Sequence, residues 1–153
     1  MTWLETRIPP PLVAALCGGI AWILCQQFPA LYVGLSYSRE CAGIIFSIGF
    51  VIAFAALWSF RVARTTFDPH SLERTSSLVT SGIYRWTRNP MYLGLALVLL
   101  GWCAALNNAL SPICIVLFVL YMNRLQIRPE ERVLLKNYGS SYRAYCERVR
   151  RWL

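Results

Sequence analysis

The stretch CAGIIFSIGFVIAFAALWSF, residues 41–60, contains twenty residues and no charged side chain. An α-helix rises about 1.5 Å per residue, so this stretch is long enough to cross a hydrocarbon core about 30 Å thick. The whole 153-residue chain is 57% hydrophobic and only 14% charged. Soluble domains carry about 25% charged residues. The composition therefore favours a single-domain, all-α membrane protein.

Three further apolar segments lie on either side of this stretch. Residues 9–28 begin with three prolines, which suit a helix start because a missing N–H group costs little there. Residues 91–106 and 109–122 are separated only by an Asn-Asn pair, so we expect a tight helical hairpin. This hairpin either stops short of crossing the bilayer or spans a thinned one as two ordinary helices. The sequence thus predicts about four transmembrane helices.

The basic residues lie almost entirely on one side of this predicted topology. Of the 15 lysines and arginines, only Arg39 falls in a connection on the opposite side. The positive-inside rule therefore places both termini and the connection of residues 61–90 in the cytosol, at the inner membrane if the cell is bacterial. Topology accounts for the formal charge of +8, and we expect no nucleic-acid partner.

The C-terminal tail is predicted to form two short cytosolic helices. The first has Pro129 in its first turn, Glu130 and Glu131 near the positive end of the helix dipole, and Gly139 as its stop. The second, within residues 140–153, is amphipathic. We expect it to lie on the membrane surface with Trp152 at the interface. Its apolar stripe consists of Tyr142, Tyr145, Cys146, Val149 and Trp152.

The cysteine and histidine content predicts no metal site. The six cysteines include no CxxC pair, and His70 is the only histidine, so the chain lacks the ligand spacing of a zinc site. Most of the cysteines lie inside apolar segments, where a free thiol behaves as a small buried hydrophobe.

Two polar segments should meet at one end of the hairpin. Residues 76–92 precede it and residues 124–131 follow it, and a helical hairpin brings its two open ends together. These segments offer backbone donors, tyrosines, arginines, an asparagine and two carboxylates above an apolar floor. The combination is typical of a pocket for a small molecule or cofactor.

The same segments carry a family resemblance. SSLVTSGIYRWTRNPMYLG, followed after one hairpin by RPEERVLLKNYGSSYRAYCERVRRW, resembles the isoprenylcysteine carboxyl methyltransferase and phospholipid methyltransferase family of integral membrane enzymes. The resemblance covers roughly residues 64–152, and the first two helices match no motif. It implies S-adenosylmethionine as cofactor, bound at the cytosolic end of the hairpin. It also implies one domain over residues 1–153, with residues 61–153 as the cofactor-binding half.

The resemblance implies the following cofactor-binding residues. Before the hairpin these are Ser76, Ser77, Leu78, Val79 and Tyr84, through backbone groups and the tyrosine ring. At the helix start they are Arg88, Asn89, Pro90, Met91 and Tyr92, and after the hairpin Glu130 and Glu131. Glutamate suits an ammonium or ribose hydroxyls, a helix start or Arg88 suits a carboxylate, and an aromatic face suits a sulfonium. No catalytic side chain is assigned, because methyl transfer mainly needs in-line placement in a dry site.

The acceptor stays open, with Arg124 and Gln126 as candidate substrate residues. Gln126 stands where carboxyl-methylating members carry an arginine, while Arg124 and Arg128 lie at other helical angles. Asn89 replaces the histidine typical of those members. A prenylcysteine-like carboxylate, a lipid amine and a small thiol all remain possible acceptors, reached from the bilayer.

Two other functional classes compete with this interpretation. Sterol reductases, which bind a nicotinamide cofactor, are similar in this C-terminal half, but the chain is short for their additional helices. A non-catalytic membrane scaffold is the other alternative. The intact Tyr84, Asn89, Tyr92 and Glu130 argue against it.

Overall fold

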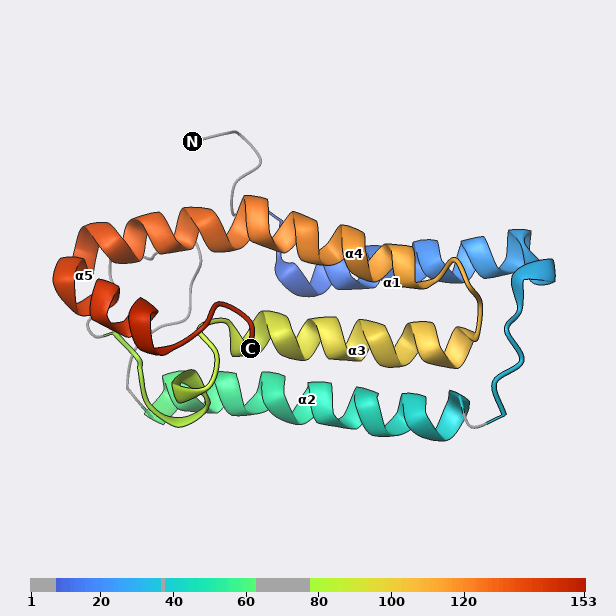
Figure 1. The fold of residues 1–153 in the computed structure, drawn as a ribbon, viewed down its shortest axis with the longest axis horizontal. Coiled ribbons are helices and arrows are strands. Elements are labelled where there is room, and N and C mark those ends of the chain that lie inside the picture. The colour runs from blue at the N-terminus through green and yellow to red at the C-terminus, as the bar shows by residue number, and fades with distance from the viewer. Residues whose placement is uncertain (1–7, 37, 63–77) are drawn as a thin grey trace.

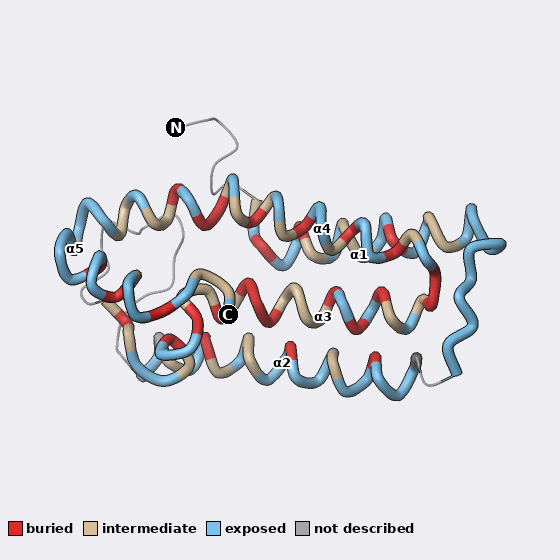
Figure 2. Tube along the Cα trace, viewed as in Figure 1, coloured by how far each residue is buried: buried red, intermediate tan, exposed pale blue. Residues whose placement is uncertain are grey.

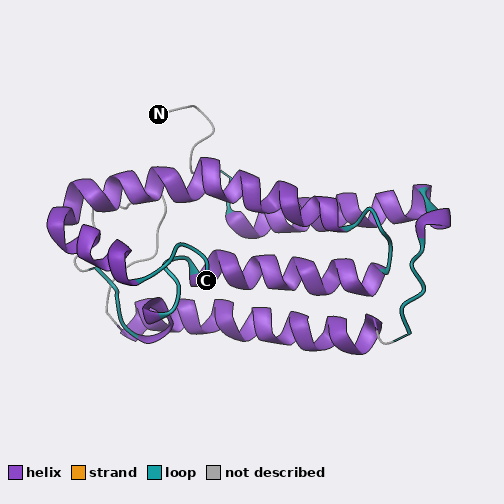
Figure 3. Ribbon diagram, viewed as in Figure 1, coloured by secondary structure: helices purple, strands orange, loops and turns teal. Residues whose placement is uncertain are grey.

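A computed structural model describes residues 8–36, 38–62 and 78–153, and its regular elements in these ranges are helices (Figures 1 and 3). The long helices run side by side along one axis, with α5 and the C-terminus at one end. The all-α prediction is therefore confirmed for the described residues. The α-helices are α1 (Pro10–Gln27), α2 (Ser38–Val62), α3 (Pro90–Leu106), α4 (Pro112–Tyr121) and α5 (Arg128–Arg148). The shorter elements are η1 (Pro29–Leu31), η3 (Gly82–Arg85) and η4 (Met122–Ile127), the last a π-helix.

Two of these helices are long and apolar enough to cross a membrane, judged by length and composition. They are α1 and residues Arg39–Ser59 of α2, and only 22% and 17% of their respective windows are buried. The outward faces of both helices carry large apolar side chains, such as Ile20 and Phe50. Such faces fit lipid better than water, and this supports a membrane protein. The total of four spans stays a prediction.

The helices α2 and α3 pack backbone against backbone through glycine. A Cβ atom added at Gly49 would lie 2.7 Å from the carbonyl oxygen of Gly94 and from the amide nitrogen of Val98. A Cβ atom at Gly94 would lie 2.6 Å from the Gly49 oxygen, and one at Gly101 would lie 2.8 Å from the Ala42 oxygen. Small residues allow this close approach between helices in membranes, where van der Waals packing drives association.

A second packing layer joins α1, α3 and α4. Leu99, Phe118 and Met122 are almost completely buried there, together with Val13 of α1 (Figure 2). The buried positions form a line through the middle of the bundle, while the outward faces remain exposed. The helix α3 is therefore central, with α2 on one side and α1 and α4 on the other.

The fourth helix ends at Tyr121, within one residue of the prediction, but the chain remains helical beyond it. α4 continues through the π-helical η4 directly into α5. The reason lies at Pro129, whose ring has no N–H group and would clash with the carbonyl of residue 125 in a regular α-helix. A local π segment rearranges the backbone ahead of the proline, so the helix continues across it. The helical path breaks at Gly139, as the sequence predicted, where φ is 48° and ψ is −116°.

The end of the bundle opposite α5 is closed by the Asn-Asn pair between α3 and α4. The backbone of Asn107 is left-handed, with φ at 50°, and its side chain donates to the carbonyl of Leu35 at 3.1 Å. Its Oδ1 accepts from the amide of Leu35 at 3.4 Å, and Asn108 Nδ2 donates to the carbonyl of Phe28 at 3.0 Å. The short hairpin connection thereby holds the α1–α2 loop.

Replacement of Asn107 by alanine should lower the free energy of unfolding by about 2 kcal/mol. Alanine is strained in the left-handed backbone conformation, and it lacks the amide group that bonds to Leu35. Asn107→Gly keeps the backbone conformation available and should cost only about 1 kcal/mol. Thermal unfolding in one detergent compares the two variants. Equal losses would mean that the backbone conformation contributes nothing.

Candidate active site at the end of the hairpin

The two ends of the hairpin meet through a buried pair of side chains. Tyr92, in the first turn of α3, is 3% exposed, and its hydroxyl donates to Oε1 of Glu130 in α5. Pro90 is buried at the first position of α3, where its fixed φ suits a helix start. The predicted proximity of the two polar segments is thus confirmed at this pair.

The carboxyl group of Glu130 has an unusual protonation equilibrium. Burial disfavours the charged form and raises the pKa of Glu130 from 4.5 to about 7, with a further contribution from the negative charge of Glu131. The hydrogen bond from Tyr92 acts in the opposite direction, because it stabilises the ionised form. This carboxyl group therefore changes charge near neutral pH.

The neighbouring Glu131 is held by two arginines. Arg151 forms a bidentate contact with it, at 3.1 Å from Nε to Oε1 and 2.7 Å from Nη2 to Oε2. Arg88 Nη2 lies 3.4 Å from Oε1, and Nη1 of the same arginine donates to Sγ of Cys146. Glu130 and Glu131 are adjacent in sequence, yet one is paired with a neutral tyrosine and the other with two cations.

The residues after α5 form a segment, Val149–Trp152, that we call the C-terminal strap. Its backbone lies along residues 87–89, where the amide of Arg88 donates to the Arg150 carbonyl at 3.0 Å. Asn89 Nδ2 donates to the Arg151 carbonyl at 2.9 Å, and Trp152 Nε1 donates to Oδ1 of Asn123 at 3.1 Å. The strap therefore ties the segment before α3 to η4 and α5.

The wall beside this network is built from aromatic and apolar groups. Tyr84 is buried with Val79 and with Ala56 of α2, and Met91 packs against them. The hydroxyl of Tyr145 donates to the Tyr84 carbonyl at 2.7 Å. Burial raises the pKa of Tyr145 to about 12, so its hydroxyl remains a neutral donor. A short connection and a tail helix thus enclose one side of the site.

Comparison with known proteins identifies the family. The phospholipid methyltransferase family matches residues 38–141, more than half of the chain. This chain belongs to the phospholipid methyltransferase family. The match includes the helix pair α2–α3 and the hairpin, together with both polar segments that meet at Tyr92 and Glu130.

Individual relatives agree with this assignment. The chain is similar to the protein-S-isoprenylcysteine O-methyltransferase of Schizosaccharomyces pombe, with 26% identity over 143 residues, 90% of this chain and 61% of the relative. The mouse protein of the same name is 37% identical over 78 residues, 49% of this chain and 26% of the relative. An uncharacterized protein of Haemophilus influenzae is 44% identical over 63 residues, which are 41% of this chain and all of the relative. The chain thus covers less than two thirds of these named methyltransferases.

Most residues predicted for the methyltransferase site lie in or beside the network around Tyr92. Leu78 packs against Tyr142 and Tyr145, and Pro90 is buried at the start of α3. Ser76 and Ser77 lie outside the described residues. The residues that the structure groups around the hairpin end are Leu78, Val79, Tyr84, Arg88, Asn89, Pro90, Met91, Tyr92, Glu130 and Glu131. Their role in binding stays a prediction.

The two candidate substrate residues do not join this network. Arg124 is exposed on η4 and takes part in none of the polar contacts described above. Gln126 is completely buried, and its Nε2 donates to the carbonyl of Ile8 at 2.8 Å. Gln126 therefore holds the segment before α1 within the described part of the chain.

The predicted amphipathic stripe of the tail packs against the protein itself. Tyr142, Tyr145 and Val149 form a buried cluster with Leu78, and Trp152 donates to Asn123. The expectation that the whole stripe faces the membrane is therefore wrong, because the sequence pattern shows an apolar face and does not show what covers it. The position of Trp152 at the interface stays a prediction.

Sequence reasoning also missed three groups of the network. Thr87 is 1% exposed, and its Oγ1 accepts from the Asn89 amide at 3.2 Å. Arg151 was counted only as a topology charge, and Cys146 only as part of a stripe. A basic residue downstream of a paired glutamate was the one available signal for Arg151.

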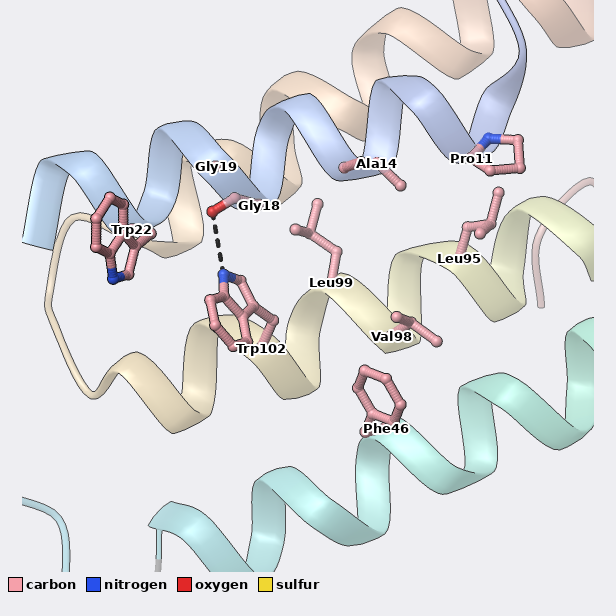
Figure 4. Close-up of a pocket in the computed structure, with 11 residues that line it drawn as sticks. Pro11, Ala14, Gly18, Gly19, Trp22, Phe46, Leu95, Val98, Leu99 and Trp102 are labelled. Atoms are coloured by element: carbon pink, nitrogen blue, oxygen red, sulfur yellow. Dashed lines mark hydrogen bonds between the residues drawn. The ribbon is translucent and has the colours of Figure 1, made fainter.

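An apolar groove begins close to this site (Figure 4). It has a volume of about 570 Å³ and lies between α1 and α3, with Phe46 of α2 at its side. Pro11 and Leu95 lie at the end nearest the start of α3, and Trp22 and Trp102 lie at the other end. Trp102 Nε1 donates to the Gly18 carbonyl at 3.0 Å, so the indole is fixed in place. Leu95 follows Tyr92 by less than one helical turn.

Proposed function

We propose that this protein transfers a methyl group from S-adenosylmethionine to a hydrophobic or membrane-borne acceptor. The observation that supports this most directly is the buried Tyr92–Glu130 pair, which joins the two segments of the family motif. Membership of the phospholipid methyltransferase family and similarity to named O-methyltransferases support the reaction class. Neither an NADPH-dependent reductase nor a scaffold gains support from these relatives.

The donor set around Tyr92 fits the proposed cofactor. Glu130 is a carboxyl group in a desolvated position, where a cationic partner would stabilise its ionised form, and the cofactor has an ammonium. Arg88 or the start of α3 suits the cofactor carboxylate, and the Tyr84 and Tyr92 rings suit its sulfonium. The cofactor would supply the methyl group as an electrophilic carbon on sulfur. The chain would bind and orient the reactants and exclude water.

The acceptor would lie in the apolar groove between α1 and α3. The groove starts within one turn of Tyr92 and is lined by aliphatic and aromatic side chains, so it suits the hydrocarbon part of a lipid-like acceptor. A prenylcysteine-like carboxylate, a lipid amine and a hydrophobic small thiol share this requirement. We further propose a multi-pass topology with both termini in the cytosol, because 14 of the 15 lysines and arginines fall on that side.

Calorimetry on the detergent-solubilised protein tests the proposal. S-adenosylhomocysteine should bind and NADPH should not. Binding of NADPH alone would favour the reductase, and binding of neither would favour a scaffold. Radiolabelled methyl transfer into an extract of lipids and thiols then identifies the acceptor.

Affinity for S-adenosylhomocysteine should increase as the pH rises from 6 to 8. The pKa of Glu130 is raised to about 7, so the carboxyl group is mostly neutral at pH 6 and mostly charged at pH 8. Only the charged form attracts the ligand ammonium. Calorimetric titrations at several pH values measure this change, and Glu130→Gln should remove it. A dependence that persists in that variant would assign the titration to another group.

A further inference from the structure

The reversal of α5 at Gly139 creates a second cavity on the polar end of the molecule. The left-handed backbone of Gly139 turns the helix, so residues 142–147 return toward residues 128–135. The resulting cavity has a volume of about 600 Å³. It is lined by Arg88, Arg128, Glu131, Arg132, Leu135, Tyr142, Arg143, Cys146 and Glu147. Glu130 and Tyr92 are not part of this lining.

The charges around the cavity favour an anion. Four arginines face two glutamates, and Glu131 is already paired with Arg88 and with Arg151 outside the lining. Arg128 and Arg132 are four residues apart on one helix, a spacing at which like charges repel each other. A bound anion would relieve this repulsion. The excess of positive charge is therefore gathered at the rim of the cavity, where Arg128, Arg132 and Arg143 are exposed.

The height of the cavity along the bundle indicates the source of the anion. Arg128 follows Tyr121, the end of apolar α4, by seven residues, or about 10 Å of helix. The polar headgroup layer extends about 5–8 Å beyond each side of the hydrocarbon core, so the Arg128 backbone lies just beyond the outer edge of this layer, and the long arginine side chain can reach back into it. The exposed Leu135 adds an apolar edge to the cavity. A ligand with a phosphate and an attached hydrocarbon part matches this combination.

We propose that this cavity, which we call the arginine pocket, binds the phosphodiester group of an anionic phospholipid in the cytosolic leaflet. Guanidinium groups match phosphate oxygens through paired hydrogen bonds, and basic pockets on the cytosolic side of membrane helices suit anionic headgroups. The lipid source rests on the orientation proposed above. The pocket borders the candidate cofactor site, with which it shares Arg88 and Glu131, while Arg128, Arg132 and Arg143 belong to the pocket alone. A lipid bound there would fix the cytosolic helices on the bilayer surface.

Thermal unfolding in a neutral detergent tests the arginine pocket. The probes are dihexanoyl phosphatidylglycerol, dihexanoyl phosphatidylcholine and inorganic phosphate, each titrated at constant ionic strength. The test variant is Arg128→Gln with Arg143→Gln. The control is Lys136→Gln with Arg148→Gln, which removes the same charge from exposed positions of α5 outside the pocket.

The phosphatidylglycerol should raise the unfolding temperature of the wild type and of the control variant at concentrations where the other two probes have little effect. In the test variant its half-saturating concentration should rise by about tenfold or more, because two charge-assisted contacts are lost. Equal responses of the two variants would overturn the proposal. Inorganic phosphate that works as well as the lipid would overturn the lipid assignment in favour of a soluble anion. Unchanged binding of S-adenosylhomocysteine by the test variant shows that this outcome is independent of the proposed function.

Discussion

Glu130→Ala should weaken the binding of S-adenosylhomocysteine by about 1.5 kcal/mol or more, which is about tenfold. Glu130 is the carboxyl group that the hydrogen bond from Tyr92 fixes at the junction of the two motif segments. Its removal takes away the proposed partner of the ligand ammonium. Calorimetry on the solubilised protein measures the change directly.

The matched control is Glu147→Ala, an exposed glutamate of the same helix, which should leave this affinity unchanged. Tyr92→Phe provides a second comparison. The Tyr92 hydroxyl stabilises the ionised form of Glu130, so its removal should raise the pKa of Glu130 further. The pH at which the affinity for S-adenosylhomocysteine increases should then move upward. If Glu130→Ala binds as tightly as the wild type, Glu130 does not belong to the cofactor site, whatever the reaction of the protein.

Two glycine-to-alanine changes in the same helix should have opposite effects on stability. In Gly49→Ala the new methyl group would lie 2.7 Å from backbone atoms of Gly94 and Val98, and backbone atoms cannot move aside as a flexible side chain can. The helices α2 and α3 must separate, and we expect a loss of about 3 kcal/mol in unfolding free energy. In Gly43→Ala the methyl group meets no atom within 4 Å. That variant should gain about 0.5–1 kcal/mol from helix propensity.

Thermal unfolding of both variants in one detergent, followed by circular dichroism, makes this comparison. Because the substitution and the helix are the same, differences in detergent binding and intrinsic propensity largely cancel. A Gly49→Ala protein as stable as Gly43→Ala would show that α2 and α3 do not pack at the described distance.

The helices α1, α2 and α3 could be predicted from sequence because each is an uninterrupted apolar segment with a clear boundary. The predicted segment 91–106 and the observed α3, Pro90–Leu106, differ by one residue, since the Asn-Pro pair marks the start. The meeting of Tyr92 and Glu130 also followed, because a helical hairpin with a short connection brings its two open ends together. These features depend on local pattern and on chain length.

The C-terminal strap could not be predicted in the same way. Its contacts use the backbone carbonyls of Arg150 and Arg151, which every residue type possesses. The continuation of α4 into α5 was missed for another reason. Pro129 usually marks a helix start, and only the π-helical segment before it shows that this proline lies inside a longer helix. Tertiary packing decides which side chain bonds to a given backbone carbonyl. It also decides which turn of a helix absorbs the strain that a proline causes.

The path from α4 through η4 into α5 is helical without a break, and under the proposed topology it would connect the site to the membrane. Phe118, in the packed middle of the bundle, and Glu130 belong to one helical rod, whereas Tyr92 belongs to α3, which is locked against α2 by glycine contacts. A helix in a bilayer of unsuitable thickness adjusts by tilting. If α4 spans the bilayer as proposed, it cannot tilt without carrying Glu130 along, while Tyr92 stays with the other pair. The thickness of the bilayer would then change the distance between Tyr92 and Glu130, and with it the geometry of the site.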